Sequence, residues 1–480
     1  MKLTAKNMYE VPNEFFFRLH HIRPRFKNNV ENVLFYVASE IARLQTEEHE
    51  AFKEKLNKAV KLYTGNFSKE LKTINNWRTE ISSLFGLIEY EGELSKAGRM
   101  ALLLSDSQDL IEFFRYFLFY FQYPGGHLKP RETFEYIKKG IKFKPAKYLI
   151  QVMLEGKKLV GDDSKFGITK AEATHCIFND LRVTRDKRSA KETAEIIIEN
   201  RKKEIEYDNK GDVIRYAGDI LDYMELADLV KLRPNYQYYL NTTNLETVQA
   251  FINNDQYFEP YQALYKKPDL TVMDVAMTQQ DWFHYVNNKL DTSIFEANIL
   301  SLIEEASETT SDQGTSIFIM EILHKIQTMR EDKTVRTKEI GDVGEAMVLE
   351  HEKTRLTHLQ REELIHLIKK IPETFAVGYD ITSFEGFSDI RRYIEVKTSI
   401  SRGKLAANNF HMTPSEWSAA NTLRKTYYIY RLMISAHDVS LFLIQDPIGQ
   451  YKEDLLDMIP RDGADIRYTE KSGQWEKLLV

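Results

Sequence analysis

Three side chains near the end of the chain could together carry out metal-assisted hydrolysis. Asp380 lies in the strand-like run 375–384, and Glu395 and Lys397 lie at the centre of a second such run, 391–400. Residues two apart in a strand face the same side, so Glu395 and Lys397 point together, and Asp380 can converge on them if the strands are neighbours. Two carboxylates beside an ammonium suit a hard cation. We expect Asp380 and Glu395 to bind Mg²⁺ and Lys397 to orient a water and stabilise charge at an attacked phosphate.

The same spacing also fits an ordinary ion pair on a half-exposed strand, which contributes about 0–1 kcal/mol. An acidic residue two positions before a lysine occurs elsewhere in the chain, for example at Asp208 and Lys210. Glu395 differs because its neighbours are β-branched and because Asp380 lies in a nearby strand. Glu345, in the helical segment before the strands, could add a third carboxylate, although a lone helical glutamate is usually solvated.

The elements around these residues predict an α/β domain over 337–480. A helical pattern at 341–370 precedes strand-like runs at 375–384, 391–400, 426–434 and 439–445. Between the second and third runs, Thr413-Pro414-Ser415-Glu416 has the residues of a helix start, with Thr at the N-cap and Glu at the third helical position. The order predicts a mixed sheet flanked by helices.

Residues 1–135 read as mostly helical. A helix over 74–86 ends at Gly86, and two short strands around Gly92 follow it. Helix and hairpin in this order are typical of a winged helix, whose second helix can enter the DNA major groove. Asn76, Arg78 and Thr79 are the candidate DNA contacts on that helix. An ordinary helical bundle with a hairpin would show the same pattern.

A second winged-helix domain is expected over 136–250. A capping box at 169–172 starts a helix before the basic run 182–191, and strand-like segments surround Arg-Pro-Asn at 233–235. Arg182, Arg185, Lys187 and Arg188 are the candidate phosphate contacts of the basic run. The acidic, helical segment 251–336, with a loop at 309–315, is expected to be a spacer.

Composition restricts the class of protein. The 480 residues suggest about three domains, and the net charge of −6 combines +6 for residues 1–150 with negative totals further along. Positive charge at the front suits an anionic partner, although fluctuation over solvated faces can also produce it. The most apolar stretch, 110–121, is interrupted by Arg115 and is too short to span a membrane, so we expect it to be core. The one cysteine, Cys176, fits a reducing cytoplasm. Without a Walker-type loop, no nucleotide cofactor is expected.

Several ordered strings are typical of known families. They are Gly344-Glu345, Gly378–Ile381, Tyr393–Thr398, Phe410–Trp417 and Tyr427–Arg431 in the C-terminal block, and Asn76–Ile81 and Phe121–Gly126 in the front part. Through them the C-terminal block resembles the NO VEIN C-terminal family, which belongs to the PD-(D/E)xK nuclease-like superfamily, and the front part is similar to the paired winged-helix recognition regions of Type II restriction endonucleases. The resemblance implies that Asp380 and Glu395 are metal ligands, that Lys397 is the catalytic lysine and that Glu345 is the helical acid; Tyr379-Asp380 stands where that superfamily has Pro-Asp.

We therefore expect a multidomain, cytoplasmic restriction endonuclease that hydrolyses double-stranded DNA at or near a recognition site with Mg²⁺. Cutting both strands with one site per chain favours a homodimer on DNA. Two alternatives stay open at this point. One is a nuclease that recognises modified DNA or defends against phage, and the other is a DNA-binding protein without catalytic activity.

Overall fold

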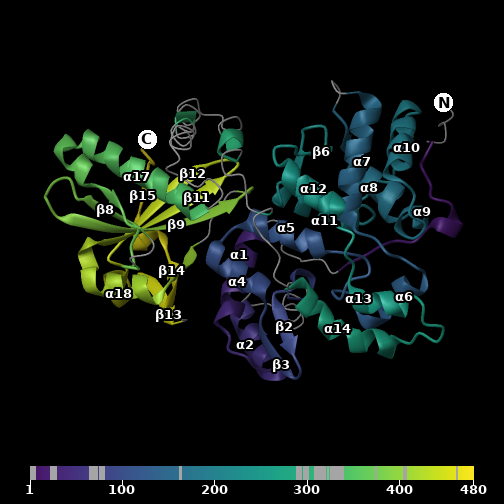
Figure 1. Ribbon diagram of the computed structural model, residues 1–480, viewed down its shortest axis with the longest axis horizontal. Coiled ribbons are helices and arrows are strands. Elements are labelled where there is room, and N and C mark those ends of the chain that lie inside the picture. Colours follow the sequence, from purple (N-terminus) through teal and green to yellow (C-terminus); the bar gives the residue numbers. More distant parts are fainter. Residues whose placement is uncertain are drawn as a thin grey trace, which may run out of the picture. The chain divides into compact units, whose positions relative to one another are not determined.

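The chain forms two compact units, each assembled from separate stretches of sequence. Unit 1 comprises Met1–Lys27, Leu44–Ala101 and Glu112–Phe295, and unit 2 comprises Asn28–Arg43, Leu102–Ile111 and Glu296–Val480. Each unit is described by itself, with elements labelled as in Figure 1. The computed structural model describes residues 7–21, 30–63, 74, 82–161, 165–287, 295, 302–306, 320–321, 324, 340–372, 376–403, 408–460 and 463–479.

Unit 2 is organised around a six-stranded mixed sheet with the order β15-β12-β11-β9-β8-β7. Strands β9 and β11 run parallel, and every other neighbouring pair in this sheet is antiparallel. Three of the four strand-like runs expected from the sequence are found as β9, β11 and β12, whereas of the run 375–384 only the last four residues form a strand, β8, so that Asp380 lies just before it. The strand bounds are β7 (Lys369–Lys370), β8 (Ile381–Phe384), β9 (Arg391–Ser401), β11 (Tyr427–Ser435), β12 (Val439–Gln445) and β15 (Gln474–Glu476).

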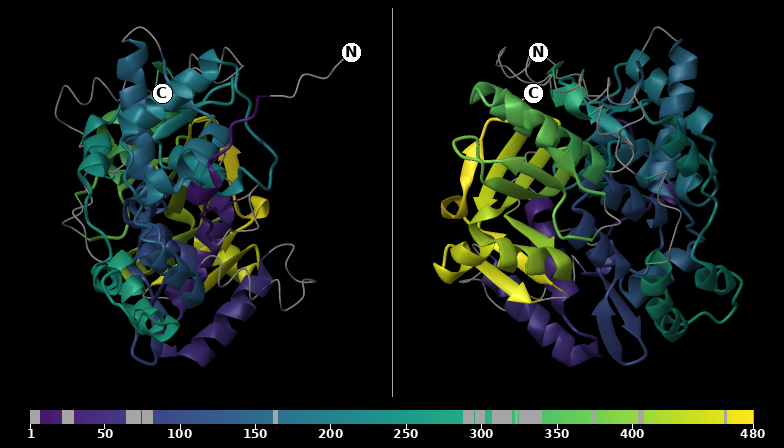
Figure 2. Two further views of the ribbon diagram at one scale, coloured as in Figure 1. Left: turned by 90° about the vertical axis from the view of Figure 1, so that its right-hand side faces the viewer. Right: turned by 60° about the vertical axis from the view of Figure 1, so that its left-hand side comes forward.

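Helices and a second sheet cover the two faces of this sheet. Helix α17 (Ile340–His358) lies along one face, and α18 (Pro414–Leu423) lies on the other together with a small antiparallel sheet of order β10-β14-β13, as Figures 1 and 2 show. Each face therefore has its own apolar core. The other elements of unit 2 are α1 (Val30–Arg43), α19 (Pro447–Lys452), β10 (Asn409–Met412), β13 (Leu456–Pro460) and β14 (Ala464–Tyr468).

Two local sequence features explain where α18 begins and how closely α17 approaches the sheet. Thr413 caps α18, since its side chain accepts from the Glu416 N–H while the Glu416 side chain accepts from the Thr413 N–H, as a capping box requires. Gly344 lets α17 approach β9 closely, because a Cβ at this position would overlap the hydroxyl of Thr398. The Gly344-Glu345 pair therefore sets both the height of the helix above the sheet and the position of its acid.

Unit 1 contains two small sheets with the same strand order. The orders β1-β3-β2 and β4-β6-β5 both place the third strand in the middle, and both end in an antiparallel hairpin. The expected hairpins around Gly92 and residues 233–235 are therefore present. The strands are β1 (Glu47–Glu48), β2 (Ile88–Glu91), β3 (Leu94–Ala97), β4 (Gly167–Ile168), β5 (Val230–Leu232) and β6 (Tyr238–Leu240).

Helices make up most of the rest of unit 1, and α4 and α5 contribute residues to both units. The described part of the expected spacer 251–336 includes α13 and α14, whose apolar side chains pack in unit 1 against Ile137 of α6. The loop predicted at 309–315 lies outside the described residues. The helices are α2 (His49–Leu62), α4 (Arg99–Ser107), α5 (Leu110–Tyr120), α6 (Pro130–Lys138), α7 (Pro145–Val160), α8 (Lys170–Ala173), α9 (Leu181–Thr184), α10 (Ala190–Lys202), α11 (Arg215–Leu226), α12 (Leu245–Asn253), α13 (Glu259–Leu264) and α14 (Val272–Val286).

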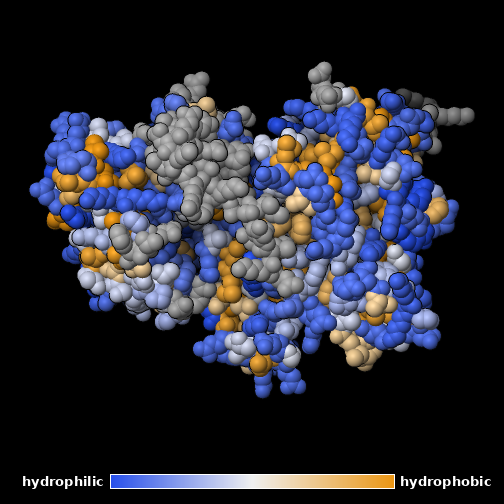
Figure 3. Space-filling model, viewed as in Figure 1, coloured by the Kyte–Doolittle hydropathy of each residue, from blue (hydrophilic) through white to orange (hydrophobic). Residues whose placement is uncertain are grey.

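The apolar run around α5 is core, as its sequence predicts. Phe114 of α5 stacks on Tyr223 of α11 with ring centroids 5.6 Å apart. Arg115 interrupts the run but is fully buried, and its guanidinium donates to the Ala227 carbonyl at 2.8 Å and lies 3.7 Å from Asp228. On the face drawn in Figure 3 hydrophilic residues cover much of each unit. Within the described part of the chain, no helix has the length and hydropathy of a membrane span.

We predict that Gly344→Ala destabilises the protein by about 1–3 kcal/mol, the usual cost of overpacking a tight contact, because the new methyl group would push α17 away from Thr398. Gly341→Ala, three residues earlier on the same helix, is the matched control. A Cβ there meets no atom within 4 Å, so it should be neutral or stabilising. Thermal unfolding of the two variants tests this, and equal midpoints would contradict the role of Gly344.

Candidate active site

Strand β9 presents Glu395 and Lys397 on one face of the sheet. Their side chains meet, with Lys397 Nζ 2.9 Å from Glu395 Oε1. Val396, between them, points the other way and packs against the core on the α17 side. The alternation of a strand thus places both functional side chains on the side of α18.

Asp380 converges on this pair from the neighbouring strand. It directly precedes β8, and its N–H donates to the Ile394 carbonyl of β9 at 2.9 Å. Its carboxylate accepts from the Val396 N–H at 2.8 Å, so it is held at the backbone between Glu395 and Lys397. The three side chains selected from the sequence are therefore together on one face.

The loop before Asp380 is fixed by close packing. Gly378 has φ +80°, a conformation that favours glycine, and a Cβ there would overlap the backbone of Ser415 at the start of α18. Tyr427 of β11 donates its hydroxyl to the Gly378 carbonyl at 2.9 Å. Helix α18 and β11 together thus determine where the Asp380 carboxylate lies.

Glu416 is a member of the site that the sequence reasoning missed. Its Oε2 lies 2.7 Å from Lys397 Nζ, so the ammonium sits between two carboxylates from different elements. The sequence marks Glu416 as the acid of the capping box, and it fills that role also. Its position in the string Phe410–Trp417 was the one signal that could have indicated a further role.

The charges of these groups keep Lys397 protonated. Burial alone would lower the pKa of Lys397, but Glu395 and Glu416 raise it above its ordinary value. Burial likewise opposes ionisation of Glu416, yet Lys397 and the hydrogen bonds from Thr413 lower its pKa. Lys397 is therefore a cation and a hydrogen-bond donor at neutral pH, and it is not available as a base.

The protein alone disfavours the ionised forms of Asp380 and Glu395. Burial, opposed in part by Lys397, raises the pKa of Glu395 well above the ordinary value, and the nearby Asp380 raises it further. The pKa of Asp380 is also raised by burial, against the effect of the Val396 N–H. One ammonium thus lies among three carboxyl groups, and a divalent cation would favour the ionised forms of Asp380 and Glu395.

The donor set fits Mg²⁺ better than a structural zinc. Within the described ranges, no group of three His, Cys, Asp or Glu side chains is placed to hold a metal ion by itself. Mg²⁺ is commonly bound by one or two carboxylates and keeps several waters, which two oxygen ligands from Asp380 and Glu395 would allow. A structural zinc site needs four protein ligands and is not formed here.

Glu345, on α17, forms an ion pair with a different lysine. Its carboxylate is 2.9 Å from Lys370 Nζ of β7, which also contacts Asp342 at 2.7 Å. Burial and then the charge of Asp380 raise the pKa of Glu345 to about 7. Glu345 is near enough to Asp380 for that carboxyl group to raise its pKa, but its direct partner is Lys370.

The basic residues of 182–191 that are candidate DNA contacts differ in whether an acidic residue of the fold already pairs with them. Asp180, fully buried, binds Arg182 at 2.7 Å and Arg188 at 3.0 Å, so these two guanidinium groups stabilise the fold. Arg185 pairs with its neighbour Asp186, and Lys187 is exposed. Asn76, Arg78 and Thr79 lie outside the described residues.

We predict that the ionisation of Glu345 makes folding pH-dependent in metal-free buffer. Its pKa in the folded protein, about 7, lies above its ordinary 4.5, so its stabilising contribution is present below pH 4.5 and is lost as the pH rises to about 7. Glu345→Gln cannot ionise and should gain up to roughly 3 kcal/mol on the wild type over this window, since one pKa unit corresponds to about 1.4 kcal/mol.

Urea unfolding of the wild type and Glu345→Gln with EDTA, between pH 4.5 and 8, measures this difference. The control is Glu363→Gln, at an exposed carboxylate whose pKa is lowered by Arg361. This variant should show no such gain. A constant difference between wild type and Glu345→Gln across the window would contradict the raised pKa.

Two family models match the chain. The model described as "Restriction endonuclease BpuJI - N terminal" matches residues 9–283. The model described as "Protein NO VEIN, C-terminal" matches residues 344–444, which include all five acidic and basic groups of the site: Glu345, Asp380, Glu395, Lys397 and Glu416. The resemblance to the NO VEIN C-terminal family inferred from the motifs is thereby confirmed.

The fold of the front part is similar to a solved structure titled "Crystal structure of pyrene- and phenanthrene-modified DNA in complex with the BpuJ1 endonuclease binding domain". The two chains are 24% identical with a TM-score of 0.51, and the match covers 57% of this chain and 99% of that one. A comparison with the curated proteins found no match. Because the first family model spans more than half of the sequence, the chain belongs to the restriction endonuclease BpuJI N-terminal family.

Proposed function

We propose that the chain is a Mg²⁺-dependent endonuclease that binds double-stranded DNA through unit 1 and hydrolyses phosphodiester bonds at the site of Asp380, Glu395 and Lys397. The observation that carries the proposal is the convergence of these side chains on one face of β9: Lys397 lies within hydrogen-bonding distance of Glu395 and Glu416, and the Asp380 carboxylate is held at the Val396 N–H between Glu395 and Lys397. Membership of a restriction endonuclease family makes DNA the expected substrate.

Two winged helices would form the DNA-binding part. In each sheet of unit 1 the first strand pairs with the third, and the hairpin follows a helix: α11 in one case and the helix ending at Phe85 in the other. This order of helix and wing supports the winged-helix assignment. The solved structure with a similar fold is, by its title, a DNA complex of an endonuclease binding domain, which supports the same role for unit 1.

The catalytic unit would be of the PD-(D/E)xK type. Asp380 and Glu395 would hold Mg²⁺, and the ion when bound would supply a water of lowered pKa and compensate charge on the phosphate. Lys397, kept protonated by Glu395 and Glu416, would donate a hydrogen bond to the attacked phosphate or to the water. Glu416 would keep the ammonium in place when Glu395 turns to the cation. One site per chain favours a homodimer for double-strand cleavage.

We predict that Asp380→Asn, Glu395→Gln and Lys397→Met each reduce Mg²⁺-dependent cleavage at least about 100-fold, because each removes a charge that the reaction requires. DNA binding should remain within about twofold of wild type. Cleavage is measured on supercoiled plasmid and phage DNA of diverse sequence, and binding by fluorescence anisotropy with EDTA.

The matched control is Asp389→Asn, which neutralises an exposed carboxylate in the loop between β8 and β9. It should cleave like the wild type. Full cleavage by Asp380→Asn or Glu395→Gln would refute the site. A wild type that binds DNA but cuts none of the substrates would favour a DNA-binding protein without catalysis.

We predict that Lys187→Gln weakens DNA binding and reduces the slope of log K against log salt by about 1, as expected for loss of one phosphate contact. The control is Lys203→Gln in the neighbouring chain segment. Lys203 is exposed and pairs with Glu199, so its replacement should leave the slope unchanged. Arg188→Gln should instead lower the melting temperature, because it leaves Asp180 buried with one partner fewer. Equal slopes for wild type and Lys187→Gln would remove this residue from the DNA interface.

A further inference from the structure

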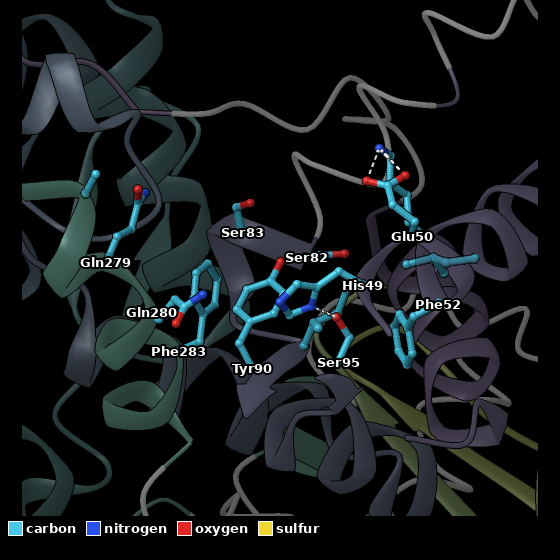
Figure 4. Close-up of a pocket in the computed structure, with 14 residues that line it drawn as sticks. His49, Glu50, Phe52, Ser82, Ser83, Tyr90, Ser95, Gln279, Gln280 and Phe283 are labelled. Atoms are coloured by element: carbon cyan, nitrogen blue, oxygen red, sulfur yellow. Dashed lines mark hydrogen bonds and ion pairs between the residues drawn. The ribbon is translucent and has the colours of Figure 1, made fainter. Parts of the chain in front are cut away.

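Unit 1 contains a cavity beside the hairpin β2–β3. It has a volume of about 470 Å³, within the range of ~300–1,000 Å³ for small-molecule sites. Helix α2 supplies one wall, the hairpin the floor, and α14 the opposite wall, with the helix end at Ser82 and Ser83 above (Figure 4). The apolar side chains that line it include Phe52 and Leu56 of α2 and Ile88 of the hairpin.

Aromatic rings form a fixed surface in this cavity. Tyr90 meets Phe283 edge-on, with centroids 4.8 Å apart, and meets His49 edge-on at 5.2 Å. His49 is held in turn by a hydrogen bond between its Nδ1 and Ser95 Oγ at 2.8 Å, which Figure 4 shows. The rings are therefore oriented before any ligand arrives, which lowers the entropy that binding must overcome.

The cavity also offers polar groups that the fold does not use. Ser82 Oγ is buried, and it has no hydrogen-bond partner among the residues that the structure describes. A buried hydroxyl without a partner destabilises the folded chain, so a ligand that forms a hydrogen bond to it would offset this effect. Gln280 lies beside the rings, whereas the Gln279 amide is already engaged with the carbonyls of Gly126 and Leu128.

The charge of the lining selects against an anion. The charged residues that line the cavity are Glu50 and Lys53, which pair with each other at 2.9 Å. A phosphate would therefore meet no net positive charge. Rings, hydroxyls and an amide around a neutral space suit an uncharged, planar heteroaromatic group that both stacks and forms hydrogen bonds.

We propose that this cavity binds a nucleobase swung out of the DNA duplex. The inference rests on the proposed DNA binding by unit 1 and adds a base-reading site to it. The cavity is lined by the hairpin, which is the wing of a winged helix, and by the C-terminal end of the helix before it. A protein that takes a base out of the stack must overcome the loss of pairing, so it prefers duplexes in which one base is already unpaired.

The test compares two 30-base-pair duplexes of the same sequence, one fully paired and one with a central base opposite an abasic site. We expect the full-length wild type to bind the second at least about 10-fold tighter. In the double variant Ser82→Ala/Gln280→Ala this preference should fall to about 1. Removing the unpartnered Ser82 hydroxyl should leave the melting temperature unchanged or higher.

Met277→Ala on α14 is the matched control, since Met277 is 74% exposed and does not line the cavity. It should keep the full preference. A preference that persists in the double variant would come from DNA flexibility and would overturn the proposal, as would a wild-type ratio near 1. Titration with free adenosine, guanosine, cytidine and thymidine separates the sources: binding of a nucleoside without a preference among duplexes would make this a free-nucleoside site. Absence of any DNA binding would instead refute the proposed function itself.

Discussion

The ammonium of Lys397 determines much of how unit 2 is built. A buried charge must be paired, and this one needs two carboxylates on separate elements, Glu395 of β9 and Glu416 of α18. Helix α18 must therefore begin over β9, and its capping box at Thr413 fixes where that first turn lies. The loop before Asp380 then packs under the same helix start at Gly378. One electrostatic requirement thus connects the mixed sheet, the helix on its face and the loop that carries the remaining acid.

Much of this site can be predicted from the sequence because its rules are local. The period of a strand places Glu395 and Lys397 on one side, and the capping box marks the start of α18 without any knowledge of the fold. The role of Glu416 cannot be predicted in this way. Its spacing from Thr413 is fully explained by the cap, so only the parallel pairing of β9 and β11, with α18 as the crossover, reveals that the same carboxylate reaches Lys397.

Contacts between distant segments account for what the sequence does not reveal. Helix α1 belongs to unit 2, where Arg43 binds Asp465 at 2.6 Å across more than 400 residues. The basic run at 182–191 shows that burial matters within one segment also, since a single buried acid, Asp180, engages two of its arginines. The pattern of charges along the sequence does not show which side chains the fold pairs in this way.

The two units differ in the kind of buried polar group that the fold leaves uncompensated. In unit 2 the Lys397 ammonium has two carboxylate partners, and what remains are two acids, Asp380 and Glu395, whose ionisation burial disfavours and a divalent cation would favour. In the ring-lined cavity of unit 1 the imbalance is a missing hydrogen bond at Ser82, with the nearby charges already paired. Folding alone does not favour either imbalance, because each raises the free energy of the folded chain. A cation in the first case and a neutral hydrogen-bonding ring in the second would relieve them, which is the physical basis for proposing chemistry in one unit and base recognition in the other.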